Sequence, residues 1–170
     1  DMTFTQSRDF MTGFKAKYNV KDWFSVHLSM HADFYDRFKR HERLDERKKV
    51  YKSCILEPRL TITSNYFNHH SLIFGIEHTS DELTSDRFVN RKMTTRALHE
   101  TEYFLQDEWI PNTHWLLSTG VRTNFSKAFG FMWMPKLAAK YSLNNHWAFR
   151  ANYSMGYRAP SIKELFFNWD

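Results

Sequence analysis

The chain has 170 residues, which is the length of one domain, and its 24 lysines and arginines against 19 aspartates and glutamates give a net charge of +5. No apolar run approaches the roughly 18 residues of a spanning helix, and a single cysteine, Cys54, excludes an internal disulfide framework. The first residues show no charged segment followed by an apolar one, so we expect no signal peptide, and both ends suggest a piece of a longer protein.

The first half of the chain alternates between apolar and polar residues in four stretches. We expect strands at about 9–20, 22–36, 51–66 and 70–80. In the second of them Phe24, Val26 and Leu28 lie on one face, opposite Ser25 and His27. A period of two is that of an extended strand with one apolar face and one polar face.

The second half resumes the alternation after a polar segment. We expect strands at about 97–110, 113–126, 131–143 and 146–158, with Asp107 interrupting the apolar face of the first. The last stretch alternates regularly from Trp147 to Tyr157. Period two sustained over about eight stretches predicts an all-β fold of antiparallel strands.

The connections and the aromatic residues favour a membrane. Short turns are expected near 20–23, 67–71, 110–115 and 143–147, whereas the segments 37–50, 80–96 and 126–131 and the residues beyond 158 are expected as loops at the other end. Tryptophan, tyrosine and phenylalanine gather near both ends of the strands. Short turns opposite longer loops, with two aromatic belts, are typical of an antiparallel transmembrane β-barrel in the bacterial outer membrane. The apolar face would then contact lipid, and residues 1–170 would be part of one barrel domain.

Two other architectures fit the same alternation. A soluble β-sandwich or lipocalin-like barrel would turn the apolar face inward, although the many large aromatic residues would crowd such an interior. A complete eight-stranded outer-membrane barrel, serving as a structural or adhesion protein or as a lipid-modifying enzyme, suits the length. The ending SIKELFFNWD, which leads into an outer loop, counts against the second alternative.

The polar faces predict a network of side chains that line a lumen. Glu100, Glu102 and Glu108 are expected to pair with Arg122, Lys136 or Lys140. The full expected network consists of Glu57, Arg59, Glu100, Glu102, Glu108, Arg122, Lys136, Lys140, Arg150 and Asn152. We expect no catalytic residues and no enzyme, because no nucleophile with a neighbouring base and no phosphate-binding loop is found.

Neither metal nor nucleic acid is expected as a partner. His27 and His31 share a polar face but lie about 13 Å apart along a strand, too far for one ion. The basic segment 37–52 is interrupted by acidic residues, as in a solvated loop. We therefore expect no metal site, no cofactor and no binding of nucleic acid.

The last hundred residues resemble a known family. The stretches TEYFLQDEW, THWLLSTGVRTNF and MPKLAAKYSLNNHWAFRANYSMGYRAPSIKELFF are similar to barrel strands of TonB-dependent outer-membrane receptors. The matching residues are Tyr103, Gln106, Asp107, Glu108, Gly120, Arg122, Pro135, Lys136, Leu137, Arg150, Ala151, Tyr153, Gly156, Arg158, Ala159, Pro160, Ser161, Glu164 and Leu165.

This resemblance implies a receptor for a scarce, large ligand such as a ferric siderophore, haem or cobalamin, energised through TonB. The family has a plug domain within a barrel of about 22 strands, so the chain would be a barrel section that works with outer-membrane lipid and, through the plug, with the TonB complex. On the implied topology, the ligand-contacting candidates at the outer strand ends are Asp33, Tyr35, Glu77, Asn124 and Arg158.

Overall fold

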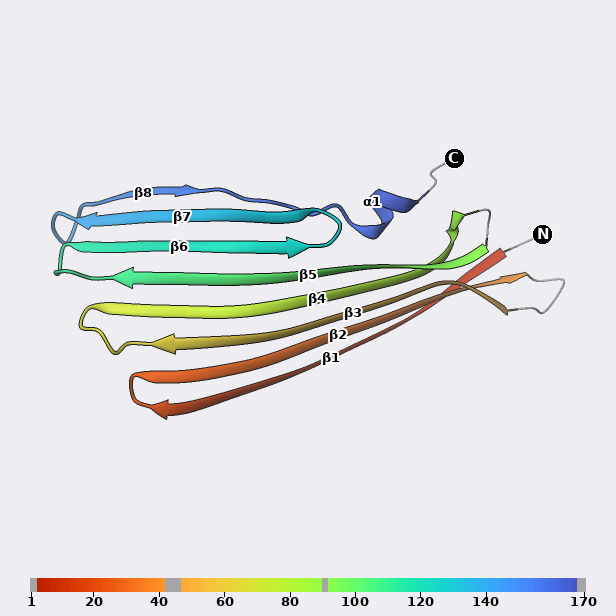
Figure 1. Cartoon of the computed structure of the whole chain (residues 1–170), viewed down its shortest axis with the longest axis horizontal. Coiled ribbons are helices and arrows are strands. Elements are labelled where there is room, and N and C mark those ends of the chain that lie inside the picture. Colours follow the sequence, from red (N-terminus) through yellow and green to blue (C-terminus); the bar gives the residue numbers. More distant parts are fainter. Residues whose placement is uncertain (1–2, 42–46, 90–91, 168–170) are drawn as a thin grey trace.

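The computed structural model describes residues 3–41, 47–89 and 92–167. These residues form eight strands and one short helix (Figure 1). The elements are β1 (Thr3–Lys21), β2 (Phe24–His41), β3 (Arg47–Ser64), β4 (His70–Val89), β5 (Lys92–Trp109), β6 (Trp115–Ser126), β7 (Gly130–Ser142), β8 (Ala148–Ser154) and α1 (Ile162–Phe166). The helix is too short to cross a bilayer, and none of the described helical segments is long and apolar enough to do so.

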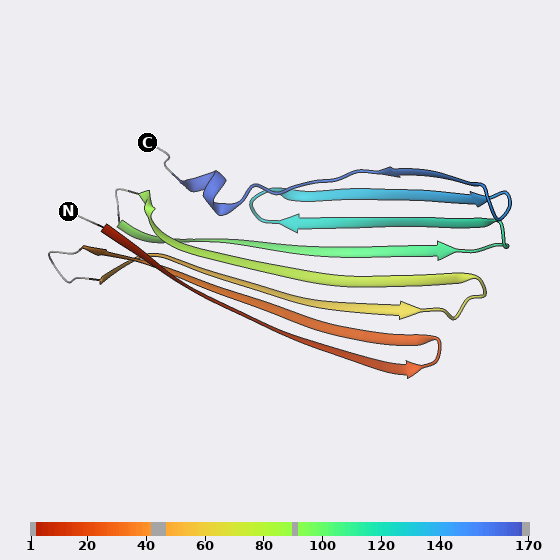
Figure 2. The ribbon, with the colours of Figure 1, turned by 180° about the vertical axis from the view of Figure 1, so that it is seen from behind.

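All eight strands lie in one antiparallel sheet whose spatial order is the chain order, β1 to β8. The connections β1–β2, β3–β4, β5–β6 and β7–β8 meet at one end of the sheet, called here the turn end (Figures 1 and 2). The opposite end, called the loop end, carries α1. Within the described residues β1 pairs with β2 and β8 pairs with β7, so the sheet does not close on itself. The complete eight-stranded barrel considered above is therefore not what this chain forms.

The strand register collects the apolar side chains on one face. Phe14 lies opposite Met30, and the same face continues through neighbouring strands to Leu137, which lies opposite Tyr153. Phe10 on this face is 63% exposed. Because cross-strand neighbours share a face, the alternation seen in the sequence becomes a continuous apolar surface, called here the apolar face.

The apolar face is not the protein's core. The side chains that are buried gather on the opposite, polar face near the loop end, where α1 folds over the sheet; they are Val50, Tyr51, Leu83, Phe88 and Ile162. A soluble sandwich would instead bury the large aromatic residues. On β2 the apolar face runs from Phe24 to Phe34, about 33 Å of strand, and a tilt of about 45° reduces this to roughly 23 Å of height. That height matches the apolar band of an outer-membrane barrel, which is about 25 Å.

One charged side chain on the apolar face has a partner. Asp107, which interrupts the alternation, lies opposite Leu72. Its Oδ2 lies 2.7 Å from Nδ1 of His70, which is the distance of a hydrogen bond or, with a protonated histidine, of an ion pair. The His70 ring stacks on Trp109 with 5.5 Å between the ring centroids. These residues lie at the turn end, so the polar pair falls at the edge of the apolar band, where its cost in lipid is smaller.

Five strands run further toward the loop end than the sequence predicts, and the first of them, β1, begins at Thr3 and not near residue 9. The expected loops 37–50 and 80–96 are largely strand, because β2 continues to His41, β3 begins at Arg47, β4 continues to Val89 and β5 begins at Lys92. Both faces of these extensions carry polar side chains, so the apolar alternation that marks a strand is lost there although backbone pairing continues. The pattern therefore locates the apolar band and not the strand ends.

The C-terminal part differs in the opposite sense. β8 is shorter than the expected 146–158, and the chain then forms α1 where a loop was predicted. Ser161 caps this helix: its Oγ accepts a hydrogen bond from the Glu164 backbone at 3.3 Å, and Glu164 Oε2 accepts one from the Ser161 backbone at 2.8 Å. This reciprocal capping box satisfies donors that a short helix would otherwise leave free. Ile162 is 1% exposed and packs in the buried cluster.

Candidate functional site

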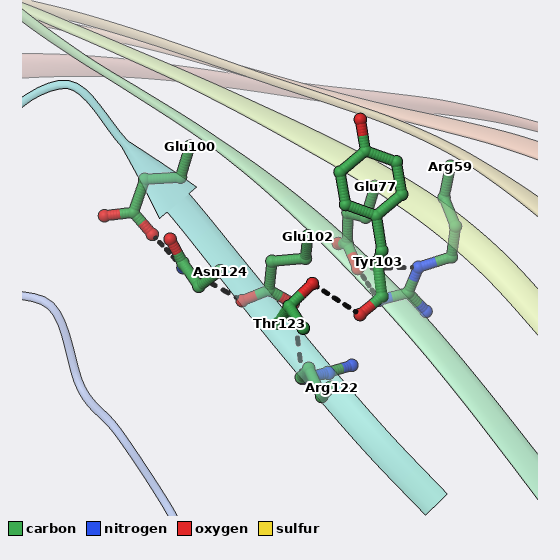
Figure 3. A network of polar contacts seen from close by, with 8 residues as sticks. All are labelled: Arg59, Glu77, Glu100, Glu102, Tyr103, Arg122, Thr123 and Asn124. Atoms are coloured by element: carbon green, nitrogen blue, oxygen red, sulfur yellow. Dashed lines mark hydrogen bonds and ion pairs between the residues drawn. The ribbon is translucent and has the colours of Figure 1, made fainter. Parts of the chain in front are cut away.

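A ladder of charged residues crosses four strands on the polar face (Figure 3). Arg59 on β3 binds Glu77 on β4, with Nε donating at 2.8 Å. Glu77 lies directly opposite Glu102 on β5, and Glu102 pairs with Arg122 on β6 at 3.4 Å. Glu77 and Glu102 thus face each other across β4 and β5, and each pairs with an arginine on its other neighbouring strand. These arginines offset the repulsion between the two carboxylates.

An amide extends the ladder toward the loop end. Asn124 Nδ2 donates to Glu100 at 2.8 Å and to Glu102 at 3.3 Å, and the side chain is 4% exposed. An amide can donate to two carboxylates without adding charge, so it links acids on one strand that would otherwise repel. The ladder makes the middle of the polar face a fixed, hydrogen-bonded surface.

The remaining residues of the expected network lie on the same face but differ in their contacts. Within the described part of the chain Glu57, Glu108, Lys136, Lys140, Arg150 and Asn152 make no ion pair. Lys140 lies directly opposite Arg150, and Glu57 lies opposite His31. The pairing expected for Glu102 with Arg122 is present, whereas Glu108 lies opposite Ser118 and not beside a cation.

At the loop end the polar face carries a cluster of aromatic and basic side chains. The rings of Tyr35 on β2 and Tyr51 on β3 meet edge to face with 5.5 Å between centroids. Arg37 donates to the Tyr35 hydroxyl at 3.1 and 3.2 Å, and its guanidinium lies 5.5 Å from the Tyr51 ring centroid. Lys163 of α1 lies 5.2 Å from the same ring centroid. We call these four residues the mouth cluster.

Two local features build the mouth cluster. Arg37 lies opposite Tyr51 in the regular register of β2 and β3; the register then shifts, so that Phe38 pairs with Lys49 and Val50 is the extra residue. The bulge leaves the unpaired Val50 buried in the same cluster as Tyr51. The capping box then fixes α1 so that Lys163 lies over the Tyr51 ring. A cavity of about 210 Å³ opens here, lined in part by Arg37, Tyr51, Arg87 and Lys163.

The charge of the mouth cluster is positive. Arg37, Arg87 and Lys163 line the cavity together with one acid, Asp86. Glu164 on α1 is engaged elsewhere: hydrogen bonds from Ser161 hold the pKa of its carboxyl below the ordinary value, with a smaller contribution from Arg158. Cations beside aromatic faces and hydroxyls suit an anionic ligand with a polarisable surface. No group of three or more metal-ligating side chains is found among the described residues.

The structure separates the five ligand-contacting candidates. Tyr35 is in the mouth cluster, and Asp33 lies two residues before it with its Oδ1 buried and without a hydrogen-bond partner. Glu77 and Asn124 belong to the charged ladder. Arg158 pairs with Glu164 of α1 at 2.7 Å and is mostly exposed.

Sequence reasoning missed the other members of the mouth cluster, which are Arg37, Tyr51 and Lys163, and also Arg87, which lines the cavity beside them. Arg37 lies in the expected loop 37–50 and Tyr51 at the start of the expected strand 51–66, because the strand extensions leave no mark in the apolar pattern. One signal was present: Ser161 followed by Glu164 is the spacing of a capping box, and it marks the helix that carries Lys163.

Comparison with known proteins gives the same fold. A model of the TonB dependent receptor-like β-barrel family matches residues 1–169. The iron-regulated outer membrane virulence proteins of two Vibrio cholerae serotype O1 strains are 24% identical over 151 residues, covering 87% of this chain and 22% of each relative. The chain therefore spans about a fifth of the length of these curated relatives.

Two solved structures from Pseudomonas aeruginosa share the arrangement of strands. A mutant of the ferric enterobactin receptor PfeA superposes with a TM-score of 0.76 and 14% identity, covering 91% of this chain and 26% of that one. The siderophore receptor PirA gives a TM-score of 0.58 and 16% identity, covering 92% of this chain and 34% of that one. At these identities the likeness concerns the fold.

Proposed function

Because this chain belongs to the TonB-dependent receptor-like β-barrel family, we propose that it is the part of a receptor that binds a ferric siderophore at the outer mouth of the barrel. The chain lies in the bacterial outer membrane, and its family is one of receptors and not of enzymes. The apolar face contacts lipid, the turn end is periplasmic, and the loop end faces outward.

The mouth cluster is the observation that carries the proposal. Its cations and tyrosines lie on the polar face at the outward end, where a ligand would arrive from outside. A ferric siderophore holds its iron through deprotonated oxygens, and a complex with net negative charge would accept hydrogen bonds from Arg37 and Lys163. The flat rings of Tyr35 and Tyr51 would contact the organic part. Of the ligands expected from the sequence, an anionic iron complex fits this combination better than cobalamin does.

The names of the similar proteins support the same ligand class. One neighbour is a ferric enterobactin receptor and another a siderophore receptor, and the curated relatives are iron-regulated. Below the mouth cluster, the charged ladder from Arg59 to Arg122 would keep the path polar while giving the wall a fixed shape. We further propose that transport through this path is energised by TonB acting on a plug domain.

Ligand binding is tested on the receptor that carries this chain, purified in detergent and titrated with ferric enterobactin, haem or cobalamin. The double variant Arg37→Gln/Lys163→Gln removes two cations from the mouth cluster. The control Lys140→Gln/Arg150→Gln removes two cations from the same face near the turn end. Since a hydrogen bond to a charged group contributes about 1.5–3 kcal/mol, we expect the first variant to bind the siderophore at least roughly tenfold more weakly and the control to bind unchanged.

The alternatives have distinct outcomes in this titration. Equal losses in both variants would mean that general charge, and not the mouth cluster, attracts the ligand. Tighter binding of haem or cobalamin than of ferric siderophores would contradict the ligand class. Energisation is measured separately, as accumulation of labelled iron by cells with and without TonB. Accumulation that persists without TonB would refute the energisation and leave the binding site standing.

A further inference from the structure

A second basic surface lies on the other face of the same strand extensions. It continues the apolar face toward the loop end. Arg8 lies two residues before Phe10 on β1, and Asp36 lies two residues after Phe34 on β2. The side chains that make it up lie on β1, β2 and β3. They are Arg8, Asp36, Phe38, Arg40, Arg47, Lys49 and Lys52. We call this surface the outward basic patch.

Phe38 is the centre of the outward basic patch. The Arg47 guanidinium lies 3.8 Å from the ring centroid, Lys49 Nζ lies 5.3 Å from it and the Arg8 guanidinium lies 5.9 Å from it. The cations come from β1 and β3 and meet over a side chain of β2, so the patch depends on the strand register and not on one basic segment. Cation–π contacts of this kind hold the charges in place on an outward face.

Within the part of the chain that the structure describes, the patch has more cations than acids beside it. Lys49 pairs with Asp36 at 2.8 Å, and both side chains remain about one third exposed. Glu82 on β4 lies beside the patch, opposite Cys54. Among the described residues, Arg8, Arg47, Lys49 and Lys52 thus face two acids, and Arg8, Arg47 and Lys52 are exposed. A partner that adds negative charge would lower the repulsion among them.

The height of the patch places it at the membrane surface. Asp36 and Phe38 are two and four residues beyond Phe34, which is about 7 and 13 Å along the strand or roughly 5 and 9 Å in height at a tilt of 45°. The polar layer on each side of the hydrocarbon is about 5–7 Å thick. The row of Arg8, Asp36 and Lys52 thus stands within this polar layer. The row of Phe38 and Lys49 begins just above it, and the ion pair with Asp36 at 2.8 Å brings the Lys49 Nζ back to the level of the first row.

We propose that the outward basic patch binds the phosphates of an anionic lipid headgroup in the outer leaflet. The siderophore cannot be its ligand, because the mouth cluster lies on the opposite face of the same strands. Arg47 and Lys49 would contact phosphate oxygens, and Phe38 would pack beside the headgroup's apolar edge. This inference rests on the membrane orientation of the sheet and not on the ligand that the receptor transports.

The strands supply a matched control for a test. Arg47 and Lys49 point outward, whereas the residue between them, Lys48, points to the polar face and lies opposite Lys39. The receptor that carries this chain is purified in detergent and titrated with lipid A, a phosphorylated glycolipid, and the retained lipid is counted by native mass spectrometry. The variant Arg47→Gln/Lys49→Gln is compared with Lys39→Gln/Lys48→Gln, which removes the same charge from the polar face of β2 and β3.

We expect the outward variant to bind lipid A roughly 25-fold more weakly, from about fivefold for each cation near a lipid surface, and the inward variant to bind as the unaltered receptor does. Dephosphorylated lipid A and free inorganic phosphate should compete poorly with lipid A, and added salt should weaken binding to the unaltered receptor. Equal losses in both variants, or undiminished binding of dephosphorylated lipid A, would overturn the proposal. The proposal would also be overturned if the outward basic patch joined two receptor copies and retained no lipid.

Discussion

Removing Arg59 tests whether the charged ladder stabilises the barrel wall. In the variant Arg59→Gln, Glu77 loses its arginine and still lies directly opposite Glu102, which pairs with Arg122 on its other side. One of two facing carboxylates is then left with its charge poorly compensated. We expect the free energy of unfolding to fall.

The magnitude follows from how buried each partner is. The side chain of Glu77 is 15% exposed and that of Arg59 is 44% exposed, so the acid is largely removed from water while the arginine is half screened. A hydrogen bond to a charged group contributes about 1.5–3 kcal/mol when buried, and an exposed ion pair about 0–1 kcal/mol. We therefore expect a loss of about 1–2 kcal/mol, of which repulsion between the two carboxylates is part.

Urea unfolding of the receptor in lipid vesicles, followed by tryptophan fluorescence, measures this loss. Arg150→Gln is the control, because Arg150 lies opposite Lys140 and makes no ion pair within the described residues; its removal should be neutral or slightly stabilising. The double variant Arg59→Gln/Glu77→Gln should recover much of the stability, since the uncompensated charge is gone. The reasoning fails if Arg59→Gln and Arg150→Gln unfold at the same urea concentration.

Two other changes have expected outcomes. A Cβ on Gly75 would stand 2.2 Å from the ring of Phe104, so Gly75→Ala should displace that ring and lower the free energy of unfolding by about 1 kcal/mol. The control Gly13→Ala should be neutral or stabilising, because a Cβ there lies 3.4 Å from its nearest neighbour. Equal effects of the two variants in urea titrations would contradict this. Ser161→Ala should speed amide exchange in α1 by about fivefold, from the roughly 1 kcal/mol of a lost cap. The pKa of Glu164 is lowered in the folded chain, so the stabilisation that its carboxylate gives α1 is fully present above the unfolded-state pKa and is lost as the pH falls through the folded-state pKa. Amide exchange in the variant Glu164→Gln should lack that pH dependence. A pH response kept by the variant would count against the role of Glu164 in the cap.

The apolar alternation was enough to predict the sheet and its two faces. Every expected strand has a counterpart, because within the bilayer one face must be apolar and the other polar, and period two records that requirement. The interruption at Asp107 was also visible. The sequence could not show that His70, 37 residues away, would be its partner across the sheet.

The strand extensions and the mouth cluster lay beyond that kind of reasoning. Outside the bilayer both faces of a strand are wet, so β2 beyond Phe34 and β4 beyond Ile76 carry charges on either side and resemble loops. Arg37 lies opposite Tyr51 because the regular β2–β3 pairing continues past the apolar band, and the register shift just beyond this pair leaves Val50 as an extra residue that lines the cavity with them. No spacing in the sequence fixes a bulge, because it is decided by how two distant segments pair.

Both proposals require that the apolar face contact lipid and the polar face line the ligand path. The most direct test places single nitroxide labels at successive positions 149 to 153 of β8 in the receptor in lipid vesicles and measures their collisions with dissolved oxygen and with a water-soluble nickel complex. We expect the labels replacing Phe149, Ala151 and Tyr153 to collide with oxygen, and those replacing Arg150 and Asn152 to collide with nickel. The opposite alternation, or the same accessibility at all five positions, would contradict the account.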